Sequence, residues 1–224
     1  MIASGVIAIV LAYLIGSIPS GYIVTRLLTA KDIRKLGGGN VGARNVSHEV
    51  GTAAGIGVGV FDIVKGAGAV VLAYWLLGWP QLQTVSISAM LVLMAGVAVV
   101  AGHIWPVYLK FTGGNGLATS IGVLSIVMTR ELAVATAFIV LFIVVTRNVI
   151  LSTNIGLISV LVSLWFFDRS WLYFVFAAVL SAILVLNFLP VAMADFAQAG
   201  SREKFFARLL RKEHTEGKTG KPSR

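Results

Sequence analysis

Two glycine-rich segments carry residues that could hold a phosphate group. The first reads GGGNVGARN over residues 37–45, and the second reads KFTGGNGLAT over residues 110–119. Glycine lets the backbone approach a ligand and turn its N–H groups towards an anion, and a helix that starts after such a loop adds positive potential. Arg34 and Arg44 flank or belong to the first segment, and arginine can bind phosphate through two parallel hydrogen bonds. The alternative is that each segment is an ordinary turn between helices.

Three ionisable residues lie in or beside apolar segments. Asp62 and Lys65, in VFDIVKGAG, are three residues apart and would share one face of a helix. An ionisable residue inside a membrane is costly, so this pair is either functional or a buried ion pair that fixes helix packing. His103, in GHIWPVY, has a side chain that titrates near physiological pH. It is a candidate general base or phosphate ligand, or else a packing residue. We interpret Asn187 as a helix cap or as a source of interhelical hydrogen bonds.

The composition indicates that these residues belong to an all-α, polytopic membrane protein. Of 224 residues, 58% are hydrophobic and only 12% are charged, which is more apolar surface than a soluble domain can bury. A membrane helix needs about 20 mainly apolar residues, and several runs approach or exceed that length. We expect seven transmembrane helices, at residues 2–28, 51–77, 85–101, 117–128, 132–146, 155–167 and 171–189.

The distribution of charge predicts how the chain crosses the membrane. The net charge is +9, and most Lys and Arg residues follow alternate predicted helices. The positive-inside rule then places the N-terminus outside, and the C-terminus and both glycine segments on the cytoplasmic side. We expect one membrane domain over residues 1–200, an amphipathic interfacial helix over residues 201–214 and a disordered basic tail over residues 215–224.

The same composition argues against several other classes. Cysteine is absent, and with only three histidines a metal site is not expected. The basic residues do not alternate with aromatic residues as they do in nucleic-acid grooves, so we expect membrane lipids rather than nucleic acid as partners.

As a set, the motifs resemble the bacterial acyl-phosphate:glycerol-3-phosphate acyltransferase family, PlsY. The matching text is GSIPSGY (16–22), DIRKLGGGNVGARNV (32–46), DIVKG (62–66) and GHIWPVYLKFTGGNGLAT (102–119). The resemblance implies a multi-pass enzyme of the bacterial cytoplasmic membrane. Such enzymes move a fatty acyl group from acyl phosphate to glycerol 3-phosphate, which gives lysophosphatidic acid for phospholipid synthesis. They use no metal and no other cofactor.

The chain departs from the family pattern at several positions. The first motif usually reads GSGNxGATN with an Arg three residues later, and Gly38, Arg44 and His48 stand at the Ser, Thr and Arg positions here. The second motif usually reads GGKG, and its Lys position is Asn115. The third is a His-x-x-Asn in the tail, for which the nearest match is Ser201 and Lys204. We therefore expect a divergent member in which Arg44 or Lys204 replaces the charge that Asn115 lacks.

This interpretation assigns roles to specific residues. The expected catalytic residues are Asn45, Lys65 and His103. The expected phosphate-binding residues are Gly38, Gly39, Asn40, Gly42, Ala43, Arg44, Gly113, Gly114, Asn115 and Gly116. Further candidates are Arg34, His48, Asp62, Ser201 and Lys204. Two other functions stay open from the sequence: a non-catalytic homologue that binds a phosphorylated lipid, and a transporter of small anions.

Overall fold

The protein is helical throughout the part that the structure describes. The computed structural model describes residues 1–82, 84–146, 149–167 and 170–199. The α-helices are α1 (Ile2–Ser17), α2 (Ser20–Thr29), α3 (Ala43–Glu49), α4 (Thr52–Leu77), α5 (Ile87–Ile104), α6 (Leu117–Val127), α7 (Thr129–Thr146), α8 (Val149–Phe166) and α9 (Trp171–Ala199). Two short 3₁₀ helices, η1 (Ile33–Lys35) and η2 (Val107–Leu109), lie in the connections.

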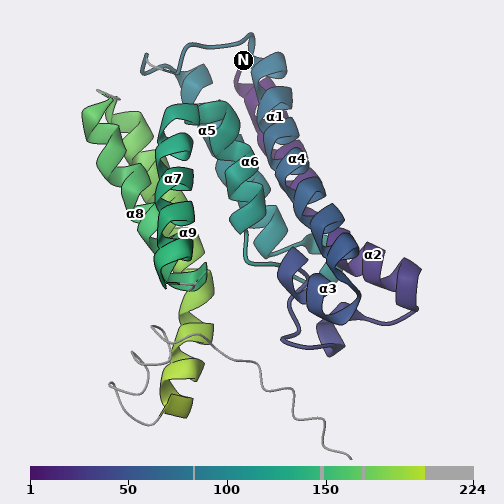
Figure 1. Cartoon of the computed structure of the whole chain (residues 1–224). Helices are drawn as coiled ribbons and strands as arrows, with labels where there is room; N and C mark the ends of the chain where they lie inside the picture. Colours follow the sequence, from purple (N-terminus) through teal and green to yellow (C-terminus); the bar gives the residue numbers. More distant parts are fainter. Residues whose placement is uncertain (83, 147–148, 168–169, 200–224) are drawn as a thin grey trace, which may run out of the picture.

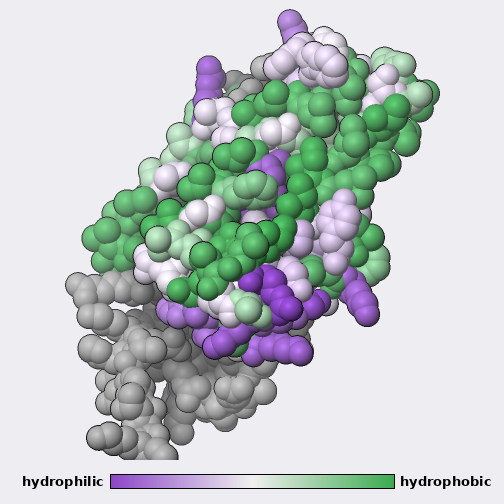
Figure 2. Space-filling view, turned by 90° about the vertical axis from the view of Figure 1, so that its right-hand side faces the viewer, coloured by the Kyte–Doolittle hydropathy of each residue, from purple (hydrophilic) through white to green (hydrophobic). Residues whose placement is uncertain are grey.

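The lengths and hydropathy of these helices confirm an all-helical membrane protein. The stretches Ile2–Thr29, Thr52–Leu77, Ile87–Leu109 and Thr129–Thr146 are each long and apolar enough to cross a bilayer. The surface carries a broad hydrophobic region, and hydrophilic residues gather at the lower end of the view in Figure 2. The expected total of seven crossings remains a prediction.

The first predicted helix, residues 2–28, is two helices rather than one. Helix α1 ends at Ser17 and α2 begins at Ser20, with Ile18 and Pro19 between them. Proline has no N–H to donate and disfavours helical backbone in the residue before it. Ile18 accordingly has ψ of 114°, outside the helical range. The break leaves the Ile18 carbonyl available to a side chain, and Lys65 Nζ donates to it at 3.0 Å.

Several other helix ends differ from the sequence prediction. Helices α7 and α8 begin at Thr129 and Val149, earlier than the predicted residues 132 and 155. The Thr129 hydroxyl donates to the Ser125 carbonyl at 2.9 Å, which ties the first residue of α7 to the last turn of α6. Helix α3 lies inside a segment that we expected to be a loop. Helix α6, predicted to be short, is 11 residues long.

Close contact between α4 and α6 depends on glycine. A Cβ atom on Gly66 of α4 would overlap the Thr119 carbonyl of α6, and one on Gly122 of α6 would overlap the Ile63 carbonyl of α4. Small residues of this kind let helices approach closely in a membrane, where there is no hydrophobic drive for helix association. Helix α1 packs in a similar way along α5. These contacts fix the start of α6 relative to α4.

Both glycine segments lie at the same end of the bundle. The N-terminus is at the opposite end, and α2 and α3 flank the connections that carry the glycines (Figure 1). The predicted tail helix at residues 201–214 and the predicted disordered segment at residues 215–224 lie outside the described residues. Ser201 and Lys204 belong to that part.

Candidate functional site

The first loop, residues 36–42, is held in shape by one side chain of α3. Asn45 Nδ2 donates to the carbonyl oxygens of Leu36 at 3.1 Å and Asn40 at 2.8 Å. Its Oδ1 accepts a hydrogen bond from the backbone N–H of Gly38 at 3.2 Å. Both ends of the Asn45 amide are therefore occupied by the loop itself. This geometry makes Asn45 a brace for the loop.

A second asparagine joins the two glycine loops. Asn40 Nδ2 donates to Oδ1 of Asn115, which lies in the second loop, residues 110–116. The other end of the Asn40 side chain, Oδ1, accepts from the backbone N–H of Gly42 at 2.6 Å. The residue at the expected lysine position thus connects the loops through a neutral amide pair. Because its oxygen accepts this bond, the Asn115 amide nitrogen remains as a donor beside the start of α6.

The second loop is seated on the end of α5. The Gly114 N–H donates to the His103 carbonyl at 3.1 Å. A Cβ atom on Gly114 would overlap the His103 ring, with Nε2 as its nearest atom, so only glycine fits here. Asn187 of α9 donates to the Gly114 carbonyl at 3.4 Å, which agrees with the interhelical role expected from the sequence.

Helix α6 begins directly after this loop and leaves its first N–H groups open. Its N-cap is Gly116, with φ of +83°, and no side chain caps the helix within the described part of the chain. The first N–H groups of a helix have no partner within the helix and carry partial positive charge. Together with the Asn115 amide they form a donor set suited to an anion.

A buried polar cluster lies beneath the first loop. Asp62 Oδ1 accepts from Ser20 Oγ at 2.7 Å and from Lys65 Nζ at 2.8 Å, and the Asp62, Lys65 and His103 side chains are buried. His103 Nδ1 is 3.6 Å from the same oxygen, which is too long for a hydrogen bond. The cluster borders a small recess that Ile18 and other residues at the α1–α2 break also line.

These contacts join three helices at the helix break. Asp62 and Lys65 come from α4, Ser20 from α2 and His103 from α5. Lys65 bonds both the Asp62 carboxylate and the Ile18 carbonyl, so two of its three donors are occupied by the protein. Sequence reasoning missed Ser20, although the motif GSIPSGY contains it. The proline directly before Ser20 was the available signal, because it indicates a helix break at which a polar side chain can lie.

The basic residues near the loops differ in their partners and in their exposure. Arg34 makes a 2.7 Å ion pair with Asp32 and lies over the Tyr22 ring, 5.3 Å from its centre. Hydrogen bonding from Arg34 lowers the pKa of Asp32 to about 2, and the same bond raises the pKa of Arg34. The Arg34 guanidinium is thus already paired with a carboxylate of the same chain. Arg44 and His48 are exposed on α3.

The described residues do not provide a metal centre. Among them, no group of three or more His, Asp or Glu side chains is placed to hold an ion. The site that the structure assembles is made of backbone N–H groups, amides and nearby cations.

The fold and this site define a multi-pass helical membrane protein with a pair of glycine loops, joined by two asparagine side chains, at one end. The glycerol-3-phosphate acyltransferase family matches residues 6–191. A glycerol-3-phosphate acyltransferase of Dehalococcoides mccartyi is 38% identical over 184 residues, which is 80% of this chain and 83% of that relative. The chain belongs to the glycerol-3-phosphate acyltransferase family.

Other relatives agree with this assignment. A glycerol-3-phosphate acyltransferase of Thermoanaerobacter pseudethanolicus is 44% identical over 122 residues, but this match spans 54% of the chain and only 57% of the relative. The crystal structure of PlsY (YgiH), an integral membrane glycerol 3-phosphate acyltransferase, in its glycerol 3-phosphate form has a TM-score of 0.77 and 25% identity, covering 93% of this chain and 95% of that one. Its lysophosphatidic acid form has a TM-score of 0.75 at 24% identity, with the same coverage.

Proposed function

We propose that this protein transfers a fatty acyl group from acyl phosphate to the 1-hydroxyl of glycerol 3-phosphate. The hydroxyl oxygen attacks the acyl carbonyl carbon, the carbon–phosphate oxygen bond breaks, and lysophosphatidic acid and inorganic phosphate leave. The observation that carries the proposal is the Asn40–Asn115 hydrogen bond, which brings both family loops to the open start of α6.

The phosphate groups of the substrates are the natural ligands for this donor set. We assign one phosphate to the first N–H groups of α6 and the Asn115 amide, with Arg44 as the nearby cation on the first-loop side. Gly38, Gly39, Gly42, Ala43, Gly113 and Gly116 supply backbone that can approach a ligand closely. Arg34 is less suited to this task because Asp32 already occupies it.

An acyl phosphate is already activated, so positioning and charge stabilisation can carry much of the catalysis. The contacts of Asn45, Lys65, Asp62 and Ser20 are with the protein itself, which supports positioning roles for them. His103 packs against Gly114 through its Nε2 side. We assign His103 the role of supporting the second loop. It is also the candidate to accept the proton of the glycerol 3-phosphate 1-hydroxyl.

We further propose seven membrane crossings in a bacterial cytoplasmic membrane, with the N-terminus outside and both glycine loops facing the cytoplasm. The crossings would be α1, α4, α5, α6, α7, α8 and α9. The placement of the N-terminus and the glycine loops at opposite ends of the bundle supports this topology (Figure 1). It gives the loops access to soluble glycerol 3-phosphate.

The test is an assay of the purified full-length protein in lipid with palmitoyl phosphate and glycerol 3-phosphate. We expect release of inorganic phosphate and formation of lysophosphatidic acid, both dependent on glycerol 3-phosphate. Mass spectrometry of the extracted lipid identifies the product. A folded protein that binds these substrates without forming product would instead be a non-catalytic homologue. No observation here favours that alternative or an anion transporter.

A further inference from the structure

A second pocket lies at the end of the bundle opposite the glycine loops. Its volume is about 300 Å³, and it forms where α4 and α6 end and where α7 and α9 begin. None of its lining residues belongs to either glycine loop or to the buried cluster around Asp62. The proposed transfer reaction therefore leaves this pocket without a role.

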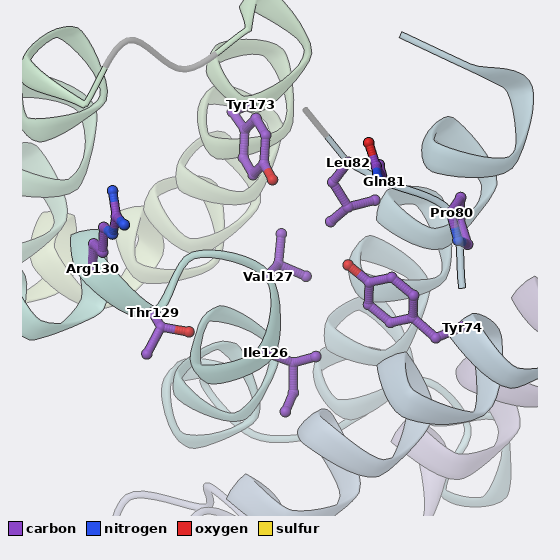
Figure 3. Close-up of a pocket in the computed structure, with 9 residues that line it drawn as sticks. All are labelled: Tyr74, Pro80, Gln81, Leu82, Ile126, Val127, Thr129, Arg130 and Tyr173. Carbon is purple, nitrogen blue, oxygen red and sulfur yellow. The ribbon is translucent and has the colours of Figure 1, made fainter. Parts of the chain in front are cut away.

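Polar groups converge on the pocket from three helices. The hydroxyl groups of Tyr74 and Tyr173 are directed towards the space between them in Figure 3, and Thr129 lies at its edge, where its hydroxyl donates to the Ser125 carbonyl. Arg130 lies at one side of the pocket, is exposed, and is the only charged side chain among the described residues that line it. Glu131, the next residue, is fully buried in α7 and does not line the pocket. The charge that these described residues present to a ligand is thus positive.

Apolar side chains complete the wall. Leu82, Ile126 and Val127 line the pocket between the polar groups (Figure 3). A ligand that fits both surfaces needs an anionic, hydrogen-bonding head joined to an apolar part. A small hydrophilic anion would satisfy only the first surface.

The surrounding aromatic residues place the pocket at the level of lipid headgroups. Trp79 stacks on Tyr74 with ring centres 5.3 Å apart. The side chains of Trp75, Trp79 and Trp171, all near helix ends, are 69%, 61% and 56% exposed. Exposed tryptophans at helix ends are typical of the boundary between hydrocarbon and water.

We infer that this pocket binds the phosphate headgroup of an anionic phospholipid from the leaflet on that side. The Arg130 guanidinium would pair with the phosphate, since arginine matches phosphate with two parallel hydrogen bonds. The Tyr74 hydroxyl would donate a further bond, and the upper part of the lipid chains would lie along Leu82, Ile126 and Val127. Basic pockets between membrane helices are suited to anionic headgroups.

Titration of the purified full-length protein in nonionic detergent tests this inference. The probe is phosphatidylglycerol, with phosphatidylcholine and inorganic phosphate as comparison ligands, and the readouts are Tm and bound lipid by native mass spectrometry. We expect phosphatidylglycerol to raise Tm through Arg130, whereas any shift from inorganic phosphate, which the glycine loops would also bind, should be the same in wild type and Arg130→Gln. Arg130→Gln should weaken its binding about tenfold or more, the usual effect of losing a charge-assisted contact.

Two controls make the result decisive. Arg26→Gln removes an exposed cation from α2, at the other end of the bundle, and should leave the Tm shift as in wild type. Arg130→Gln should keep its rate of lysophosphatidic acid formation in the same lipid, which separates the pocket from the transfer site. The inference is overturned if Arg130→Gln and wild type respond equally to phosphatidylglycerol, or if phosphatidylcholine gives the same Arg130-dependent shift.

Discussion

At the scale of single residues, Asn115 stands at the lysine position of the family pattern with which the sequence was compared. It supplies an amide where a lysine is usual, and its oxygen accepts a hydrogen bond from Asn40. An amide donates a weaker bond to phosphate than an ammonium group does. We therefore propose that the loop attracts an anion mainly through backbone N–H groups and Arg44.

Two substitutions at Asn115 separate bracing from phosphate binding. Asn115→Asp keeps an acceptor for Asn40 but brings a negative charge to the loop, whereas Asn115→Ala removes both functions. If the amide faces phosphate, the KM for glycerol 3-phosphate should rise roughly tenfold in the alanine variant and much more in the aspartate variant. Steady-state kinetics checks this order. An aspartate variant that performs better than the alanine variant would show that Asn115 only joins the loops.

The contribution of Arg44 is a separate prediction. Its guanidinium is exposed beside the first loop, in the first turn of α3. Arg44→Ala should raise the KM for glycerol 3-phosphate roughly tenfold, the usual cost of one charged contact with phosphate, with little change in Tm. His48→Ala, on the same short helix and also exposed, is the matched control. A KM for Arg44→Ala equal to that of the wild type would remove Arg44 from the site.

The glycine loops and their flanking charges were visible in the sequence, and so was the pairing of Asp62 with Lys65. The partners of these residues were not. From the sequence alone, Asn45 was predicted to be catalytic. Only the folded loop shows that its side-chain amide hydrogen-bonds to the backbone of Leu36, Gly38 and Asn40. Ser20 reaches Asp62 only because the chain breaks at Pro19. Contacts between residues distant in sequence depend on packing, which no local motif encodes.

At the scale of elements, the buried cluster fixes the relation between α1, α2, α4 and α5. Breaking a buried ion pair leaves an uncompensated charge, which costs about 3–5 kcal/mol, whereas replacing both members with apolar residues can be far less harmful. Asp62→Leu and Lys65→Met should each lower stability strongly. The double variant should be more stable than the sum of the two single effects predicts. Unfolding in detergent measures the four stabilities.

The contact between α4 and α6 gives a second prediction at this scale. Gly66→Ala should force the helices apart, because its Cβ would overlap the Thr119 carbonyl. Gly68→Ala, two residues away, meets no atom within 4 Å and should stabilise α4 by about 0.5–1 kcal/mol. Tm measurements compare the two. If both variants behaved alike, close packing at Gly66 would not be what positions α6.

Sequence periodicity located most helices but misplaced their ends. Apolar runs are easy to recognise, and those in α4 and α5 match the predictions within three residues. The break at Ile18 and Pro19 was missed because apolar residues resume after it, although the small and polar residues of GSIPSGY (16–22) and its proline mark the end of α1. Short α3 was missed because its glycine-rich and polar surroundings are typical of a loop, and its packing against α4 stabilises it.

At the scale of the whole molecule, the proposed topology has a direct test. The chain contains no cysteine, so a single introduced cysteine is a unique label site. Thr84 and Thr112 are exposed near opposite ends of the bundle. In intact spheroplasts, a membrane-impermeant maleimide should label Thr84→Cys and should label Thr112→Cys only after lysis. The reverse pattern would place the glycine loops outside.

The hydrogen bond between Asn40 and Asn115 joins residues on either side of the connection between α4 and α5. A chain divided in that connection would carry one glycine loop in each fragment, and neither fragment would hold a whole site. The packing of α1 on α5 and of α4 on α6 offers the surfaces for the fragments to reassociate. Co-expressed halves should therefore regain activity by complementation, so that turnover becomes a direct reporter of helix assembly in the membrane.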